Sequence, residues 1–180
     1  MVMCYVGINY RRAKLAVREQ LSFTDGSRLE FLSRAERLGV SQCMILSTCN
    51  RSEVFYFTED SGTKGGHMDI RQLYLDMFPG SKADGYLEEL CGAEAIAYLF
   101  RITAGLESLV LGEDQILGQV REAFEFSKAV GMTGKELNKV VREAVTLAKR
   151  IKTELKVSEK PLSVSYIGIQ SIDRCFGIAG

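Results

Sequence analysis

The sequence has no tryptophan, two prolines and a single histidine in 180 residues. It also has no excess of charge, because 23 Lys and Arg balance 23 Asp and Glu. This balance excludes nucleic-acid binding through overall positive charge, although a local basic face stays possible. No apolar run approaches the ~20 residues of a membrane span, and at the N-terminus the apolar residues precede the charged ones, unlike in a signal peptide. We therefore expect a globular protein that binds no membrane and resides in the cytoplasm.

The five cysteines are odd in number, and no Cys-x-x-Cys pair is present. A disulfide framework is therefore not expected, whereas a reducing compartment is. We expect no metal, since a single histidine and scattered cysteines do not make a zinc site. Four of the cysteines lie within or beside apolar stretches, a placement typical of small buried hydrophobic residues. These four are Cys4, Cys43, Cys91 and Cys175.

The first half of the chain alternates short apolar runs with amphipathic stretches. The resulting order of strand, helix, strand, strand, helix, strand is typical of the ferredoxin-like split βαβ sheet. Thr24 or Asp25 can cap the first helix, whose expected apolar positions are Leu29, Leu32, Ala35 and Leu38. The last strand could instead lead into the next helix. Strands are expected at residues 3–9, 43–47, 53–58 and 86–90, and helices at 25–38 and 68–78.

Beyond Cys91 the pattern is helical almost to the end of the chain. Helices are expected at residues 93–104, 113–130 and 135–157. The apolar residues of the last helix keep a spacing of three to four for about six turns, which is long for a compact domain. We therefore predict an α+β fold in which a ferredoxin-like sheet is followed by a helical part and a long connector helix.

The segment 47–52 places a cysteine at a turn between two expected strands. A turn gives Cys49 access to solvent, and a neighbouring cation favours the reactive thiolate over the thiol. Thr48, Asn50 and Arg51 supply donors that can hold an oxyanion or a substrate carboxylate. The same residues also fit a structural interpretation, in which Thr48 and Asn50 form the turn, Cys49 is buried and Arg51 is solvated. Both interpretations stay open on the residues alone.

A second polar segment, residues 105–119, lies at the entry to an expected helix. Acidic residues suit the first turn because of the helix dipole, and the two glutamines are four residues apart and share a face. These side chains could hold a small polar ligand, or simply cap the helix and face solvent. Gly112 and Gly118 could permit close backbone approach. The candidate ligand contacts are Ser108, Glu113, Asp114, Gln115 and Gln119.

Two basic groups could meet a phosphate backbone or be solvated. Between residues 135 and 160, eight basic residues stand against four acidic ones. The second group consists of Arg11, Arg12, Lys14 and Arg18.

Three stretches of the chain resemble the N-terminal catalytic domain of glutamyl-tRNA reductase. They are STCNRSEVFYF at residues 47–57, AGLESLVLGEDQILGQVREAF at 104–124 and CYVGINYRRAKLAVREQLSF at 4–23. This family uses NADPH to reduce the glutamyl group on its tRNA to glutamate-1-semialdehyde, at the start of five-carbon tetrapyrrole synthesis, which leads to porphyrins and heme. The resemblance implies that Cys49 attacks the ester and forms a thioester. It also implies that Thr48, Asn50 and Arg51 line the glutamate pocket, and that Ser108, Glu113, Asp114, Gln115 and Gln119 match other substrate-contacting positions.

The resemblance further implies a division of the chain. Residues 1–156 correspond to the catalytic domain that binds glutamyl-tRNA, and residues 157–180 to a linker and the start of a missing NADPH-binding domain. No Gly-x-Gly-x-x-Gly fingerprint occurs in the chain. For the full-length enzyme we expect a homodimer, with a downstream glutamate-1-semialdehyde aminotransferase as a partner.

Two positions depart from the pattern of the family. Asp114 stands where proline is usual, so that any role there rests on the backbone. The family usually has a histidine shortly before the helix that ends in AGL, whereas residues 88–94 read EELCGAE. We assign the role of that histidine to no residue.

Two other classes of protein stay open. A thiol acyl hydrolase or transferase unrelated to tRNA would need a base near Cys49, for which His67 is the one histidine. A non-catalytic RNA-binding adaptor would expose aromatic residues on its sheet, and Phe55, Tyr56 and Phe57 are candidates.

Overall fold

A computed structural model describes residues 1–59, 66–81, 83–109 and 115–155, with the backbone alone at 66–69 and 155. Four strands, six α-helices and two 3₁₀ turns follow one another within these ranges. In chain order they are β1 Val2–Asn9, α1 Leu15–Arg18, η1 Glu19–Leu21, α2 Asp25–Arg37, β2 Gln42–Thr48, β3 Arg51–Thr58, α3 Gly66–Met77, η2 Ala83–Tyr86, β4 Glu88–Cys91, α4 Ala93–Thr103, α5 Gln115–Ala129 and α6 Lys135–Leu155.

The four strands form one antiparallel sheet in the order β2-β3-β1-β4. This is the strand order of the predicted ferredoxin-like topology, which the structure confirms. Residues 86–90 divide between the end of η2 and β4, so the segment does contain the fourth strand. The short α1 and η1 between β1 and α2 were not predicted, because their four and three residues are too few to show a helical period.

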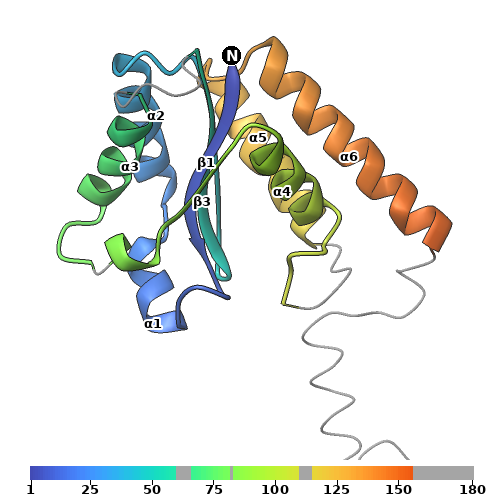
Figure 1. The fold of residues 1–180 in the computed structure, drawn as a ribbon, viewed down its shortest axis with the longest axis horizontal. Helices are drawn as coiled ribbons and strands as arrows, with labels where there is room; N and C mark the ends of the chain where they lie inside the picture. Colours follow the sequence, from blue (N-terminus) through green and yellow to red (C-terminus); the bar gives the residue numbers. More distant parts are fainter. Residues whose placement is uncertain (60–65, 82, 110–114, 156–180) are drawn as a thin grey trace, which may run out of the picture.

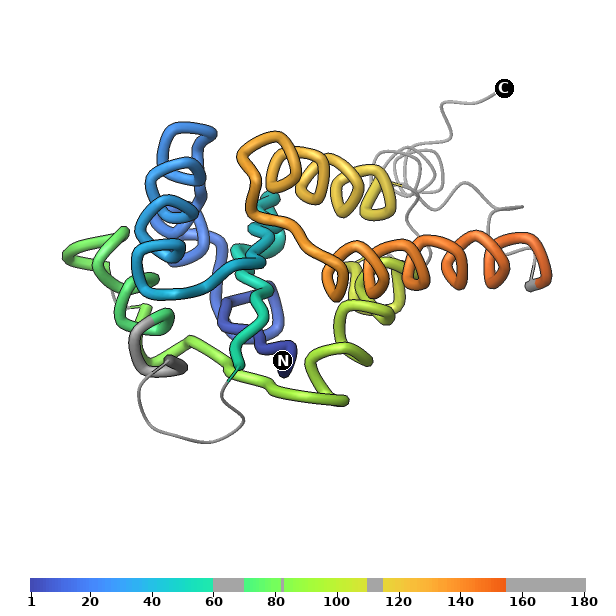
Figure 2. The backbone as a smooth tube through the Cα atoms, turned by 90° about the horizontal axis from the view of Figure 1, so that it is seen from above, coloured from blue at the N-terminus to red at the C-terminus, as the bar shows by residue number. Residues whose placement is uncertain are grey.

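Helices cover both faces of the sheet. Helices α2 and α3 lie on one face, and α4, α5 and α6 lie on the other, as the side and top views show (Figures 1 and 2). Since successive side chains of a strand point to opposite faces, Cys4, Val6 and Ile8 pack under α2 and α3, whereas Met3 and Tyr5 pack under α4 and α5. Burial on both faces explains why β1 is a continuous apolar run rather than an alternating one.

Helix α2 begins with the capping residue that the sequence predicts. Thr24 Oγ1 accepts a hydrogen bond from the Ser27 backbone N–H at 3.2 Å, and Ser27 Oγ accepts one from Thr24 N–H at 2.9 Å. The predicted apolar face was wrong at both ends, because Leu29 and Leu38 are exposed. A strict spacing of three residues turns about 60° around the helix at each step, so these two leucines lie on opposite sides. Phe31, Leu32 and Ala35 form the buried face instead.

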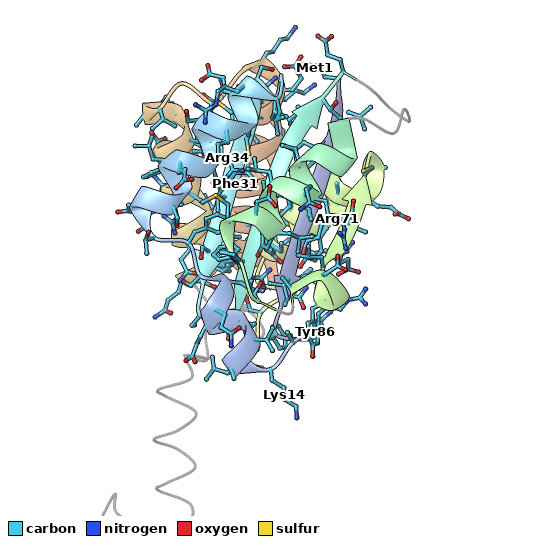
Figure 3. All side chains as sticks on the ribbon, turned by 90° about the vertical axis from the view of Figure 1, so that its left-hand side faces the viewer. Met1, Lys14, Phe31, Arg34, Arg71 and Tyr86 are labelled. Atoms are coloured by element: carbon cyan, nitrogen blue, oxygen red, sulfur yellow. The ribbon has the colours of Figure 1, made fainter. Side chains whose placement is uncertain are left out.

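Figure 3 looks onto this α2–α3 layer, with Phe31 and Arg34 on α2 and Arg71 on α3. Met1 and Lys14 mark opposite ends of the molecule in this view. Lys14 precedes α1, so α1 lies at the end of the sheet where β1 finishes. The turn between β2 and β3 lies at the same end, because Asn9 pairs with Arg51.

The first two residues of β2 attach the sheet to the connection between α5 and α6 and to the start of α6. Cys43 N–H donates to the carbonyl of Met132, which lies between α5 and α6, at 2.9 Å. Gln42 Oε1 accepts from Leu137 N–H at 2.9 Å in the first turn of α6. A Cβ atom at Gly134 would lie 2.7 Å from Gln42 Cδ, so glycine allows this close approach.

Candidate active site

The turn between β2 and β3 presents a cysteine to solvent. Thr48 and Arg51 pair across the two strands, so Cys49 and Asn50 form a two-residue hairpin loop. Asn50 N–H donates to Thr48 Oγ1 at 3.2 Å, so Thr48 does act as a turn former. Cys49 is exposed. The structural interpretation in which Cys49 is buried is therefore wrong.

A pocket lies between this hairpin and the N-terminal half of α5. It brings together candidate residues from the two polar segments, which are far apart in the sequence. Glu113 and Asp114, the remaining candidates, lie outside the described residues. The lining residues are Thr48, Cys49, Asn50, Arg51, Ser108, Gln115, Ile116 and Gln119.

Arg51 lines the pocket on its side toward the protein core and is almost fully buried, with 2% of its surface exposed. The alternative of a solvated Arg51 is therefore wrong. Its Nη1 atom lies 3.2 Å from Oε2 of Glu53, which is fully buried. Its Nη2 atom donates to the backbone carbonyl of Glu107. The guanidinium group is thus held on one side by β3 and on the other by the segment after α4.

Two tyrosine hydroxyls complete the surroundings of Glu53. Its Oε1 atom accepts hydrogen bonds from Tyr98 at 2.6 Å and from Tyr5 at 3.3 Å. Asn9 Nδ2 donates to the Tyr98 hydroxyl at 3.0 Å, so Tyr98 both donates and accepts. The network joins β1, β3 and α4 beneath the pocket.

Burial and charge act against each other in this network. Burial raises the pKa of Glu53 above its ordinary value, while Arg51 and the tyrosine hydroxyls favour the charged carboxylate. Burial alone would lower the pKa of Arg51, but Glu53 and the tyrosines together raise it. The pKa of Tyr98 is raised by burial first and by the charge of Glu53 second. Tyr98 therefore stays protonated, and its hydroxyl donates a hydrogen bond to Glu53.

Glycine at position 7 makes room for the buried carboxylate. Gly7 pairs with Glu53 across β1 and β3. A Cβ atom at this position would lie 2.8 Å from Glu53 Cα and 2.9 Å from Glu53 Cγ. Any larger residue would therefore push Glu53 away or separate the two strands.

Ion pairs hold the segment after α4 against the chain that follows β1 and against α4 itself. Glu107 pairs with Arg11 at 2.6 Å and with Arg101 at 2.9 Å. The Tyr10 hydroxyl donates to the carbonyl of Ser108 at 3.3 Å. These contacts come from the chain just after β1 and from α4, and they place Ser108 at the pocket.

Other predictions fail or lie beyond the described residues. Cys4 and Cys43 are buried as predicted, but Cys91 is exposed, because β4 is an edge strand and Cys91 is its last residue. Nothing within 4 Å would meet a Cβ atom at Gly118, so no described part of the protein itself approaches this glycine closely. The His67 side chain, Gly112 and Cys175 lie outside the described residues.

The three aromatic residues proposed for RNA binding are buried. Phe55, Tyr56 and Phe57 are at most 4% exposed, since helices cover both faces of the sheet. These three residues therefore cannot serve as the exposed sheet aromatics of an RNA-binding adaptor.

Sequence reasoning did not identify Glu53, Tyr98, Tyr5 or Gly7. A signal for Glu53 exists, because Arg51, Glu53, Phe55 and Phe57 share one face of a strand at a period of two. An acid and a base on an otherwise apolar face indicate a buried ion pair. Nothing local indicates Tyr98, whose partner is 45 residues away along the chain.

Within the described residues, no three His, Cys, Asp or Glu side chains gather into a metal-ligating group. No helix in the same ranges has the length and apolar character needed to cross a membrane. Fold and site together define an α+β domain that presents an exposed thiol beside a polar pocket with a buried arginine as its floor.

The sequence matches the family model for the glutamyl-tRNA(Glu) reductase N-terminal domain over residues 6–155. The glutamyl-tRNA reductase of Clostridium novyi is 36% identical over 178 residues, which cover 98% of this chain and 43% of the relative. That of Alkaliphilus metalliredigens is 39% identical over 176 residues, covering 96% and 41%. The solved structure of the Methanopyrus kandleri enzyme superposes with a TM-score of 0.75 at 28% identity, covering 96% of this chain and 39% of that one. The chain therefore belongs to the glutamyl-tRNA reductase N-terminal domain family and spans about two fifths of the length of these relatives.

Proposed function

We propose that this chain provides the acyl-accepting site of a glutamyl-tRNA reductase, with Cys49 as the nucleophile. The observation that carries the proposal is the position of Cys49, exposed at a hairpin tip and lining one pocket with Arg51. Family membership supplies the substrate, a glutamyl group esterified to tRNA.

The chemistry of an ester suits a thiol without a strong general base. The thiolate Sγ of Cys49 attacks the carbonyl carbon of the glutamyl ester and forms a carbon–sulfur bond. The bond between that carbon and the ribose oxygen then breaks, and the ribose leaves as a hydroxyl after taking a proton from solvent. The products are a glutamyl thioester on Cys49 and free tRNA.

Arg51 is proposed to bind the side-chain carboxylate of the glutamyl group. A guanidinium has five N–H donors in a rigid fork, and Glu53 and the Glu107 carbonyl engage Nη1 and Nη2 from the side of the core. Donors thus remain for a second carboxylate on the pocket side. The polar groups proposed to surround the rest of the substrate are Thr48, Asn50, Ser108, Gln115 and Gln119, together with Glu113 and Asp114.

Reduction of the thioester to glutamate-1-semialdehyde by NADPH is proposed for the longer protein, as a step toward tetrapyrroles. For the longer protein we also propose a homodimer and transfer of the product to a glutamate-1-semialdehyde aminotransferase. The described strands pair antiparallel, whereas dinucleotides bind at the carboxyl ends of parallel strands. The described residues therefore do not fit a dinucleotide, and we propose that NADPH binds in another part of the longer protein.

The proposal is tested by incubating the chain with glutamyl-tRNA labelled on glutamate and trapping protein-bound label in acid. We expect label on Cys49, located by peptide mapping, and its loss in the Cys49→Ser variant. The matched control is Cys91→Ser, which replaces the other exposed cysteine of the described residues and should retain the label. Label that persists in Cys49→Ser, or that maps to Cys91, would contradict the proposal.

A further inference from the structure

Two arginines contact the backbone of the Cys49 hairpin. Arg18 is the last residue of α1, and its Nε donates to the carbonyl oxygen of Cys49 at 3.2 Å. Arg28 lies in the first turns of α2, and its Nη2 donates to the carbonyl oxygen of Ser47 at 3.3 Å. Two guanidinium groups from different helices therefore stand at one hairpin, beside an exposed thiol.

The charges of these two arginines are poorly compensated. Within the described residues Arg18 forms no ion pair, and its hydrogen bonds go to the carbonyls of Cys49 and Ala13. Arg28 has one acidic partner there, Asp25, at 3.5 Å, and that carboxylate is 85% exposed, which makes a weak pair. The Nε atom of Arg28 is buried and has no hydrogen-bond partner among the described residues.

The neighbouring arginines differ in this respect. Arg11 pairs with Glu107 and Arg12 pairs with Glu88, each at 2.6 Å. Of the basic group that the sequence indicates near the N-terminus, Arg18 alone combines contact with the Cys49 hairpin and a lack of an acidic partner within the described residues.

Arg28 also lies along the face of α5 that forms the pocket. Its guanidinium carbon is 5.8 Å from the centre of the Phe126 ring. Gln115, Gln119 and Phe126 follow one another at spacings of four and seven, so they share one face of the helix. Both glutamines line the pocket. The bond from Arg28 to the Ser47 carbonyl places its weakly compensated charge next to Thr48 and Cys49, which line the pocket.

We propose that Arg18 and Arg28 bind the phosphate of the 3′-terminal nucleotide of the tRNA substrate. This inference rests on the proposed function and names a part of the substrate that the pocket itself does not hold. The ribose that leaves in acyl transfer belongs to this nucleotide, which carries a phosphate on its 5′ side. When the ester carbonyl reaches Cys49, that phosphate comes to lie beside the hairpin. Guanidinium groups suit phosphate through paired, charge-assisted hydrogen bonds, and such contacts position a nucleic acid rather than read its sequence.

The test uses two small substrates that differ in one group. One is 3′-O-glutamyl-adenosine, and the other is the same ester carrying a 5′-phosphate. Acylation of Cys49 is followed by mass spectrometry of the chain. We expect the phosphorylated ester to react with a kcat/KM at least about tenfold higher, since contacts to a charged group have this magnitude. The preference should decline as salt is added.

Substitutions assign the preference to the two arginines. Arg18→Gln and Arg28→Gln should each lower the ratio of the two rates, and the double variant should bring it close to one. Taking the ratio cancels any shift of the hairpin, because both esters meet the same Cys49. Arg28→Lys keeps the charge and should retain part of the preference. The matched control, Arg37→Gln, changes an exposed arginine at the other end of α2 and should leave the ratio unchanged.

The outcomes separate this inference from the proposed function. Equal rates for the two esters in the wild-type chain, or a preference that survives in the double variant, would overturn the phosphate site and leave the nucleophile intact. Failure of both esters and of glutamyl-tRNA to acylate Cys49 would overturn the proposed function and this site with it.

Discussion

At the scale of single residues, Glu53 belongs both to the core and to the candidate site. It is fully buried, touches Gly7 across the strand pair, and accepts hydrogen bonds from two tyrosines. It also holds the guanidinium of Arg51, which lines the pocket. Removal of one partner of a buried pair leaves an uncompensated charge, which costs more than the pair itself contributes.

Glu53→Ala should therefore destabilise the fold by about 3 kcal/mol. Glu53→Gln should cost less, because its amide oxygen can still accept from Tyr98 and Tyr5. Denaturant unfolding of the three proteins at one pH measures both differences. An alanine variant as stable as the glutamine variant would show that these hydrogen bonds contribute little.

The pH dependence of the stability difference between the wild type and Glu53→Gln tests the direction of the Glu53 pKa shift. The pKa of Glu53 is raised in the folded state above its ordinary value of 4.5, mainly by burial. A carboxyl with a raised pKa stabilises the fold below its unfolded-state pKa, and this contribution is lost as the pH rises through the folded-state value. The advantage of the wild type over Glu53→Gln should hence shrink as the pH rises from 4.5. An advantage that grows with pH would mean that Arg51 and the tyrosines outweigh burial.

At the scale of elements, α6 is attached to the sheet by one buried glutamine. Gln42 begins β2, and its side chain accepts from Leu137 N–H and donates to Glu136 Oε2 at 2.7 Å. Helix ends leave backbone N–H groups without partners, so Gln42 replaces a local cap for the longest helix. The hydrogen bond from Gln42 lowers the pKa of Glu136.

Gln42→Ala should loosen the first turn of α6 and lower the free energy of unfolding by about 1 kcal/mol, as for the loss of a helix cap. Hydrogen exchange at Leu137 N–H should accelerate more than exchange at Val141 N–H. Gln72→Ala is the matched control, because Gln72 is exposed on α3 and its side chain donates to Asp76 of the same helix. Equal acceleration at Leu137 in both variants would contradict the capping role.

At the scale of the whole molecule, the order of strands along the chain could be predicted because β1, β2 and β3 are separate, largely apolar runs, whereas the polar β4 could have been read as the start of a helix. The positions of Cys49, Thr48 and Arg51 at a turn could be predicted for the same reason. The buried face of α2 was predicted wrongly, since Leu29 and Leu38 fit a strict spacing of three residues, whereas a helix has 3.6 residues per turn. The depth of Arg51 was missed although Arg51 and Glu53 share a strand face with Phe55 and Phe57, whereas Tyr98 and Tyr5, which bond to Glu53, come from distant positions that the sequence does not connect.

The coverage of both sheet faces predicts a graded protection of the cysteines. In a Cys175→Ser background, iodoacetamide should modify Cys49 first. Cys91 should follow more slowly, because burial raises its pKa. Cys4 and Cys43 are buried, and their pKa values are raised by burial, so they should react only when the sheet unfolds. Modification is read by peptide mapping against denaturant concentration. Reaction of Cys43 in the native chain at the rate of Cys49 would contradict the covered sheet.

The tight contact between Gly7 and Glu53 also limits how this pocket can change in evolution. Under the proposed role of Arg51, a substrate with a different side chain would require a replacement of Arg51, and that replacement would leave the buried Glu53 without its cationic partner. A neutral residue at Glu53 would have to appear with it, and Gly7 would leave a gap if that residue were smaller. The same three positions, Gly7, Arg51 and Glu53, thus affect both the proposed substrate choice and the stability of the fold. We therefore expect a stable variant with altered specificity to need at least two substitutions at once.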